Sequence, residues 1–253
     1  MRKLLPFLLL PLFLTGCSTD TIADRTYAGA LALSGDTLTL QPFDTESCLS
    51  VTAPDLTEAL RMAELQTGGR IFIGHTELVC LDGTRTLDAV EELFFTDGLS
   101  PACKIAYAPP ETLGKTDSIR HVHALRMAER NGMLPETDLT TVTDEWLGAW
   151  KTALVPTLED PPGMVLLSVD GKAVKLTNAQ IRGLCILRSR KPHLYADGNS
   201  LFLTASASEQ ADIREALRIL HTANADVIGI EQVLAREKIP LPEKVPEISI
   251  KSP

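Results

Sequence analysis

The last third of the chain repeats one local pattern, first in residues 167–184 (LSVDGKAVKLTNAQIRGL) and again in residues 194–217 (LYADGNSLFLTASASEQADIREAL). In each copy, a short alternating segment leads to an Asp-Gly pair, a second short segment and a stretch with helical spacing. Asp-Gly favours a tight turn because such turns need positive φ angles. The pattern predicts strand, turn, strand and helix, twice. We therefore expect residues 117–236 to form an α+β domain with one antiparallel sheet and helices on one face.

Short strands separated by turns are expected from Tyr27 onward. Alternating segments flank Ser34-Gly35-Asp36, which is a hairpin signal, and a helix is expected between Pro54 and Gly68. Strand patterns return after that helix. Several strands and one helix within residues 27–104 predict a small antiparallel β-barrel-like domain, because closing the sheet removes exposed strand edges.

Proline-rich segments mark the expected domain limits. Residues 105–116 contain Pro109 and Pro110 and are expected to be a linker between the two domains. Residues 237–253 contain four prolines and are expected to form an extended tail. The predicted fold class is thus α+β, with a barrel-like domain followed by the α+β domain.

The first sixteen residues have the layout of a secretion signal. Arg2 and Lys3 precede a short apolar run, which at about 1.5 Å per residue covers only about half of a bilayer core. The run ends at Leu14-Thr15-Gly16-Cys17, which resembles the lipobox of bacterial lipoprotein precursors. This resemblance implies cleavage after Gly16, acylation of Cys17 and a lipid-anchored tether over residues 17–26.

The resemblance also implies a location and a first partner, the membrane itself. Ser18 stands where the family's inner-membrane retention signal has Asp, so in a Gram-negative cell the lipid anchor would lie in the outer membrane. Separately, the layout of residues 27–104 resembles the small barrel domains of NlpE-type envelope lipoproteins. That second resemblance implies a similar barrel and carries over no functional residue.

The charge balance excludes some classes of partner. The chain has 24 basic and 33 acidic residues, a net charge of −9, and loss of Arg2 and Lys3 with the signal makes it −11. Nucleic-acid binding is excluded because phosphate contacts need clustered Lys and Arg side chains. Broad adhesion to anionic membrane surfaces is disfavoured for the same reason.

Four cysteines remain after Cys17, and an even number suits disulfides in an oxidising envelope. We expect Cys48 to pair with Cys103, since closing a loop of this length would stabilise the fold by about 4 kcal/mol in the chain-entropy model. Cys80 and Cys185 would either pair between the domains or remain buried thiols. No Cys-x-x-Cys spacing is present, so no metal site or other cofactor is expected.

Two further groups of residues are candidate sites. His75 and Glu77 have strand spacing, which would place an imidazole and a carboxylate on one face as a ligand pair, an acid/base pair or a cross-strand polar contact. Arg188, Arg190 and Lys191 form the one basic cluster of this acidic chain. They are either a solvated loop before Pro192 or a contact for an anion, such as a lipopolysaccharide phosphate or an acidic partner.

The motifs of common enzyme classes are absent from the sequence. It contains no Gly-x-Ser-x-Gly, no Gly-x-Gly-x-x-Gly and no complete Gly-x-x-x-x-Gly-Lys-Ser/Thr phosphate loop. The leading hypothesis is therefore a non-catalytic binding or assembly module, a lipid-anchored envelope lipoprotein that meets an envelope protein or another cell-envelope partner. The alternatives are an envelope enzyme with a site built from sequence-distant residues and a lipoprotein that senses metal or stress.

Overall fold

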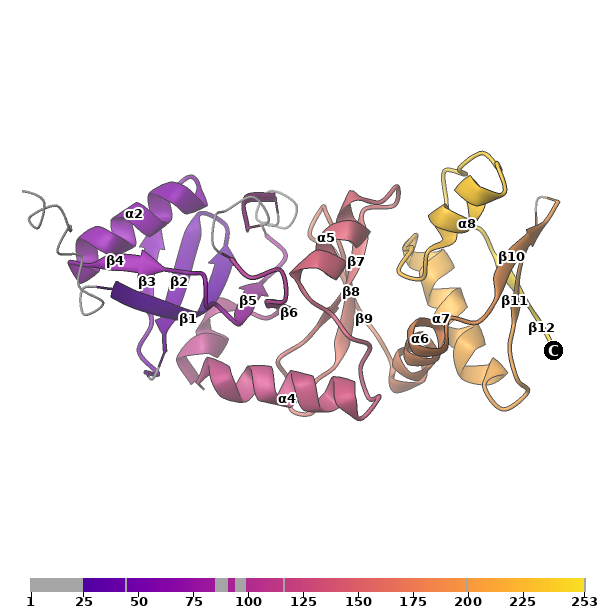
Figure 1. The fold of residues 1–253 in the computed structure, drawn as a ribbon, viewed down its shortest axis with the longest axis horizontal. Coiled ribbons are helices and arrows are strands. Elements are labelled where there is room, and N and C mark those ends of the chain that lie inside the picture. Colours follow the sequence, from indigo (N-terminus) through magenta and orange to yellow (C-terminus); the bar gives the residue numbers. More distant parts are fainter. Residues whose placement is uncertain are drawn as a thin grey trace, which may run out of the picture.

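The fold is α+β, as the sequence predicts, and its elements follow one another along an elongated molecule (Figure 1). A mixed sheet lies at one end, a small sheet at the other, and helices and a third sheet lie between them. The computed structural model describes residues 25–43, 45–84, 91–93, 99–115, 117–198 and 200–252.

The first sheet is mixed, with strand order β3-β2-β1-β5-β6 and β4 paired to the start of β1. Its strands are β1 (Arg25–Ser34), β2 (Thr37–Pro42), β3 (Leu49–Thr52), β4 (Arg70–Phe72), β5 (Leu78–Leu81) and β6 (Lys104–Tyr107). The first three strands are antiparallel, whereas β4 and β5 run parallel to β1, and β6 runs parallel to β5. The expected antiparallel barrel is therefore wrong. Residues 28–33 and 78–81 are buried throughout, which is typical of strands covered on both faces.

The sheet is extended beyond β6 by a second, antiparallel set of strands. These are β7 (Thr152–Pro156), β8 (Met164–Ser168) and β9 (Ala173–Lys175), in the order β7-β8-β9. Tyr107 of β6 forms a parallel bridge with Thr157, directly after β7. The 44 residues between these two strands thus return the chain to the edge that β6 leaves open.

Two hydrophobic clusters lie on opposite faces of these strands. The first packs α2 (Leu56–Thr67) and α5 (Leu139–Leu147) on Leu31, Ile105 and Val155. The second packs α4 (Ser118–Arg130), α6 (Asn178–Arg190) and α7 (Gln210–Ala223) on the other face. Both clusters combine residues from before and after the expected linker, so residues 105–116 do not separate two cores. This range instead contains most of the buried strand β6 and the 3-10 helix η2 (Pro110–Lys115).

The repeated pattern in the last third is confirmed locally, but its two copies do not share a sheet. The first copy forms β8, β9 and α6, and the second forms β10 (Leu194–Asp197), β11 (Ser200–Thr204) and α7. In the second copy, the hairpin belongs to a separate sheet, β10-β11-β12. The helices α6 and α7 pack closely on each other and lie between the two hairpins (Figure 1). The prediction of one antiparallel sheet is therefore wrong.

The proline-rich end of the chain is part of the fold. Strand β12 (Ile248–Lys251) pairs in parallel with β11, and Val245 is buried. The N–H of Val245 donates to Oδ1 of Asn224 at 2.7 Å. Residues 248–251 are extended, as expected, but they are not a tail, because Ile248 and Ile250 pack against the hydrophobic core and the strand pairs with β11.

Candidate functional site: the Arg188 cleft

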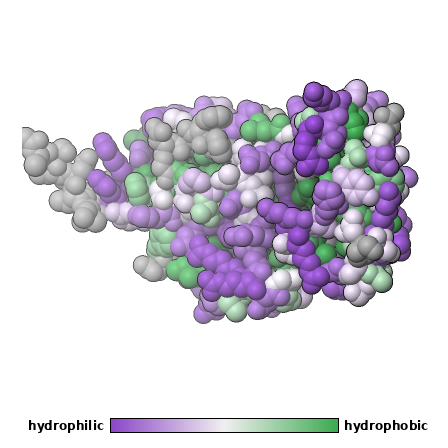
Figure 2. All heavy atoms as spheres, turned by 45° about the vertical axis from the view of Figure 1, so that its right-hand side comes forward, coloured by the Kyte–Doolittle hydropathy of each residue, from purple (hydrophilic) through white to green (hydrophobic). Residues whose placement is uncertain are grey.

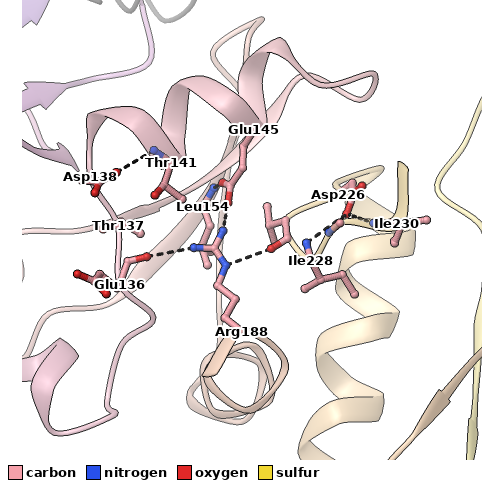
Figure 3. Close-up of polar contacts among 12 residues, drawn as sticks. Glu136, Thr137, Asp138, Thr141, Glu145, Leu154, Arg188, Asp226, Ile228 and Ile230 are labelled. Carbon is pink, nitrogen blue, oxygen red and sulfur yellow. Dashed lines mark hydrogen bonds and ion pairs between the residues drawn. The ribbon is translucent and has the colours of Figure 1, made fainter. Parts of the chain in front are cut away.

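An open cleft of about 1450 Å³ lies where α5, α6 and α8 (Ile230–Arg236) approach one another. We call it the Arg188 cleft. One wall is formed by α5 and the segment before it, and the other by α6 and the loop that leads into α8 (Figure 3). The face turned forward in Figure 2 is mostly hydrophilic, with smaller hydrophobic areas between the polar residues. Both kinds of residue line the cleft, including Leu134, Ile186 and Ile228 as well as many charged residues.

Arg188, in the last turn of α6, connects the walls of the cleft (Figure 3). Its guanidinium group forms an ion pair with Glu145 of α5. Nε donates to the carbonyl oxygen of Val227 at 3.1 Å, and Nη1 donates to that of Glu136 at 3.2 Å. Burial lowers the pKa of Arg188 to about 10, so the group remains charged at neutral pH.

Glu145 is as well buried as its partner, with 10% of its side chain exposed against 15% for Arg188. Its Oε2 accepts the N–H of Leu154 in β7 at 2.7 Å. A buried ion pair stabilises a fold only when hydrogen bonds compensate for the loss of water. The contacts of this pair provide such compensation, and they fix α5, α6 and the loop before α8 relative to one another.

Asp226 shapes the loop that forms the rim of the cleft. Its Oδ1 accepts the N–H groups of Ile228, Gly229 and Ile230 at 3.1, 2.9 and 2.9 Å, and its Oδ2 accepts that of Glu231 at 2.8 Å. These four N–H groups precede or begin α8, where no helical carbonyl can reach them. The loop is therefore held in one conformation by a single carboxylate.

A second carboxylate connects the two walls directly. Oε2 of Glu231, in the first turn of α8, accepts the N–H of Ala149 at 2.9 Å. Asp138 similarly accepts the N–H of Thr141 and caps α5. Several acidic residues of the cleft are thus engaged in hydrogen bonds that hold its walls in place.

No family model, curated protein or solved structure matches this chain. Within the residues that the structure describes, every helix is too short or too polar to cross a bilayer.

The chemistry of the cleft lining does not resemble that of a nucleophilic active site. The described lining contains no histidine to act as a base. Its one thiol belongs to Cys185, and burial raises the pKa of this thiol to about 11, whereas a catalytic cysteine needs a lowered pKa. The Ser189 hydroxyl donates to the carbonyl oxygen of Cys185 at 2.6 Å, one turn back in the same helix. Neither Cys185 nor Ser189 is therefore activated as a nucleophile in the described lining.

The basic cluster lies in and after the last turn of α6, not in a solvated loop. Arg188 points into the protein, Arg190 forms an ion pair with Glu209, and Lys191 is exposed in a left-handed conformation at the helix end. Two of the three charges thus have acidic partners within the chain. No local pattern predicts the pairing of Arg188 with Glu145, because Glu145 lies 43 residues before Arg188. Contact with an external anion stays a prediction.

His75 and Glu77 do not come together as a pair. His75 lies in a turn after β4, where its ring centroid is 5.4 Å from that of Phe72 and 6.1 Å from that of Tyr27. Glu77 instead forms an ion pair with Arg126 of α4, at 3.5 Å. The expectation of a shared strand face is wrong because residues 74 and 75 leave the extended conformation.

The expected disulfide between Cys48 and Cys103 is also wrong. Both are free thiols, as are Cys80 and Cys185. Cys48 precedes β3 and Cys103 precedes β6, at opposite edges of the first sheet. Four strand spacings of about 4.8 Å separate those edges by about 19 Å, whereas a disulfide needs Cα atoms within about 7 Å. Cys17 lies outside the described residues, so its acylation stays a prediction.

The tripeptide Gly114-Lys115-Thr116 matches the end of the phosphate-loop motif, but the rest of that motif is absent. Gly114-Lys115-Thr116 precedes α4, as in a phosphate loop, but Pro109 stands where that loop needs its first glycine. Asp117 caps α4 and accepts the N–H of Ile119 at 3.1 Å. A carboxylate therefore occupies the helix end that a phosphate loop offers to its anion.

Proposed function

We propose that this chain is a lipid-anchored envelope lipoprotein and that it acts as a non-catalytic binding or assembly module. The lipobox Leu14-Thr15-Gly16-Cys17 supports the anchor. An anchor of two or three acyl chains holds a protein stably at a membrane surface and raises its effective concentration toward partners in that plane. Even a weak contact with an envelope protein then suffices.

We propose that the partner binds in the Arg188 cleft. This proposal rests on one observation, which is that the buried and half-buried carboxylates of the cleft accept hydrogen bonds from the backbone. Glu145, Asp226 and Glu231 each accept N–H groups, and these bonds hold the walls of the cleft in place. A volume of about 1450 Å³ exceeds the range of about 300–1,000 Å³ typical of small-molecule pockets. An open, preformed cleft of this size suits a loop or an extended segment of another protein, because little ordering accompanies binding.

Site-specific photo-crosslinking in the native host tests the proposed seat. A photoreactive residue at Asp144, exposed on the cleft wall, should capture one discrete partner, whereas the same residue at Glu215 on α7 should not. Ala149→Trp, which fills the cleft, should abolish the crosslink from position 144. Ala207→Trp, at an exposed alanine away from the cleft lining, should leave it unchanged. Equal capture from both positions, or no effect of Ala149→Trp, would contradict the proposal.

The proposed anchor has its own test. Mass spectrometry of the mature protein from its own cells should find an acylated Cys17 as the first residue. The variant Cys17→Ser should lose membrane fractionation while keeping a folded body, since the described elements begin at Arg25. An unmodified amino end in the native protein would contradict the anchor.

A further inference from the structure

The outer face of α4 combines positive charge with exposed apolar side chains. Six exposed residues lie within about 120° of the helix circumference, at 100° per residue. They are Ile119, Arg120, His123, Arg126, Met127 and Arg130. We call this set the α4 outer face. In the view of Figure 1, α4 forms the lower margin of the molecule, with no labelled element beyond it.

The apolar side chains of this region stand out among the described residues. Among the described residues, seven large hydrophobic side chains are exposed to solvent. Three of these seven belong to α4 and the turn after it. Ile119 is 44% exposed, Met127 is 39% exposed, and Met133 is 55% exposed. Binding to a lipid surface increases with the apolar area that is buried and with the electrostatic attraction to anionic lipids, and this surface offers side chains for both.

The charge of the face is opposite to that of the chain as a whole. Glu129, the one acidic residue within α4, points away from this face and accepts two hydrogen bonds from Nζ of the buried Lys104, at 2.9 and 2.8 Å. Two acidic neighbours contact residues of the face. Glu77 pairs with Arg126 at 3.5 Å, and both side chains are partly exposed, whereas the Asp117 carboxylate accepts the N–H of Ile119 at the start of the helix. Three arginines therefore form a basic strip on a protein of net charge −9. An anionic surface would attract this strip and repel most of the remaining surface.

The chain between the proposed anchor and the fold is long enough to let α4 reach a bilayer. Eight residue spacings from Cys17 to Arg25 extend to at most about 28 Å. Ser118, the first residue of α4, lies beside Gly29, since a Cβ on Gly29 would be 3.0 Å from its Oγ. Gly29 is four strand residues from Arg25, or about 13 Å. The start of α4 therefore lies about 13 Å from the end of the tether, which is less than the distance of about 28 Å that the tether can span.

We infer that the α4 outer face docks on the anionic lipid surface in which the chain is anchored. This inference rests on the proposed lipid anchor, which would place the face beside a bilayer. The arginines would contact phosphate groups, while Ile119 and Met127 would enter the interface between headgroups and acyl chains. Since Glu129 and Leu134 also line the Arg188 cleft, docking would hold that cleft close to the membrane surface.

The test uses an artificial tether, so it does not depend on native acylation or on a cleft partner. A chain that starts at Ser18, and so retains every described element, carries an N-terminal hexahistidine and is held on vesicles by a nickel-chelating lipid. Met127→Trp reports contact through quenching by brominated phosphatidylcholine. The native tryptophans, Trp146 and Trp150, are at most 9% exposed, and the unsubstituted chain gives their background. Leu241→Trp is the control reporter.

Quenching at position 127 is expected on vesicles that contain phosphatidylglycerol and is not expected at position 241. Each arginine near an anionic surface contributes a factor of about five, so Arg120→Gln, Arg126→Gln and Arg130→Gln together should weaken docking about 100-fold. The matched triple variant Arg214→Gln, Arg218→Gln and Arg236→Gln, in α7 and α8, should leave the quenching unchanged.

Two results would overturn the inference. One is the absence of quenching at position 127, which would favour an acidic protein as the partner of this face. The other is quenching at position 127 that is as strong on purely phosphatidylcholine vesicles, or in the α4 triple variant, as on vesicles with phosphatidylglycerol. Binding would then not depend on the arginines.

Discussion

Gly183 of α6 lies so close to Asp212 of α7 that a Cβ on Gly183 would be 2.2 Å from the carbonyl oxygen of Asp212. The same Cβ would be 2.7 Å from the Cβ of Ala216. Beside this contact, Nε and Nη2 of Arg182 each donate to the Asp212 carboxylate at 3.0 Å. The two helices are thus joined by a backbone contact that only glycine permits, next to an ion pair.

Gly183→Ala should destabilise the protein because the added methyl group would push α6 away from α7. Overpacking of a close contact typically costs about 1–3 kcal/mol, measured as a lower free energy of unfolding in urea. Gly114→Ala is the matched control, since nothing lies within 4 Å of its Cβ position. Equal effects of the two substitutions would show that the helices separate without cost.

The Arg188–Glu145 pair should behave as one coupled unit. Arg188→Met would leave the Glu145 carboxylate buried without its charge partner, and breaking such a pair costs about 3–5 kcal/mol. Glu145→Gln keeps an acceptor for the N–H of Leu154. In urea unfolding, the double variant should therefore be more stable than the sum of the two single effects predicts.

An exposed pair provides the control for this cycle. Arg61 and Glu58 form an ion pair one turn apart in α2, with Nη2 and Oε1 at 2.6 Å. Exposed pairs contribute little because water screens them. Arg61→Met and Glu58→Gln should show little coupling, and a coupling as large as that of the buried pair would contradict the role assigned to burial.

Asp170 should make stability depend on pH in the acidic range. Hydrogen bonds from Ser168 and Lys172 lower the pKa of this carboxyl from 3.8 to about 2. Because the folded state favours the charged form, the contribution of Asp170 is present above pH 3.8 and is lost as the pH falls toward 2. The difference in urea midpoint between the native chain and Asp170→Asn should shrink over this range. A difference that does not change with pH would contradict this assignment.

The four described cysteines should differ in reactivity and should not be cross-linked. Cys48 is exposed and should be alkylated in the folded protein, whereas Cys80 and Cys103 should react only after unfolding. Burial raises the pKa of Cys103 to about 12, which further suppresses its thiolate. Intact mass spectrometry after alkylation, before and after addition of urea, counts the reactive thiols. A Cys48–Cys103 disulfide in protein purified without reductant would contradict the structure.

Sequence reasoning succeeded where a signal was local. Asp170-Gly171 and Asp197-Gly198 each predicted a turn between two strands and a following helix, and the structure confirms both. It failed where the answer depended on partners far along the chain. The local pattern extends a strand to His75, although the strand ends at Phe72. It leaves Arg188 either in a solvated loop or in contact with an external anion, although its partner lies in α5.

The sequence by itself determined the α+β class, the positions of α2, α6 and α7 and of the turns at the Asp-Gly pairs, and the expectation of a lipid anchor at Cys17, because these depend on neighbouring residues. Only the tertiary structure decided that β6 is a buried strand of the first sheet and not part of a linker, that β12 completes the last sheet, and that Arg188 joins the walls of a cleft. Strand pairing and buried ion pairs join residues tens of positions apart. Their partners are selected by the packing of both sheet faces, which no local pattern encodes.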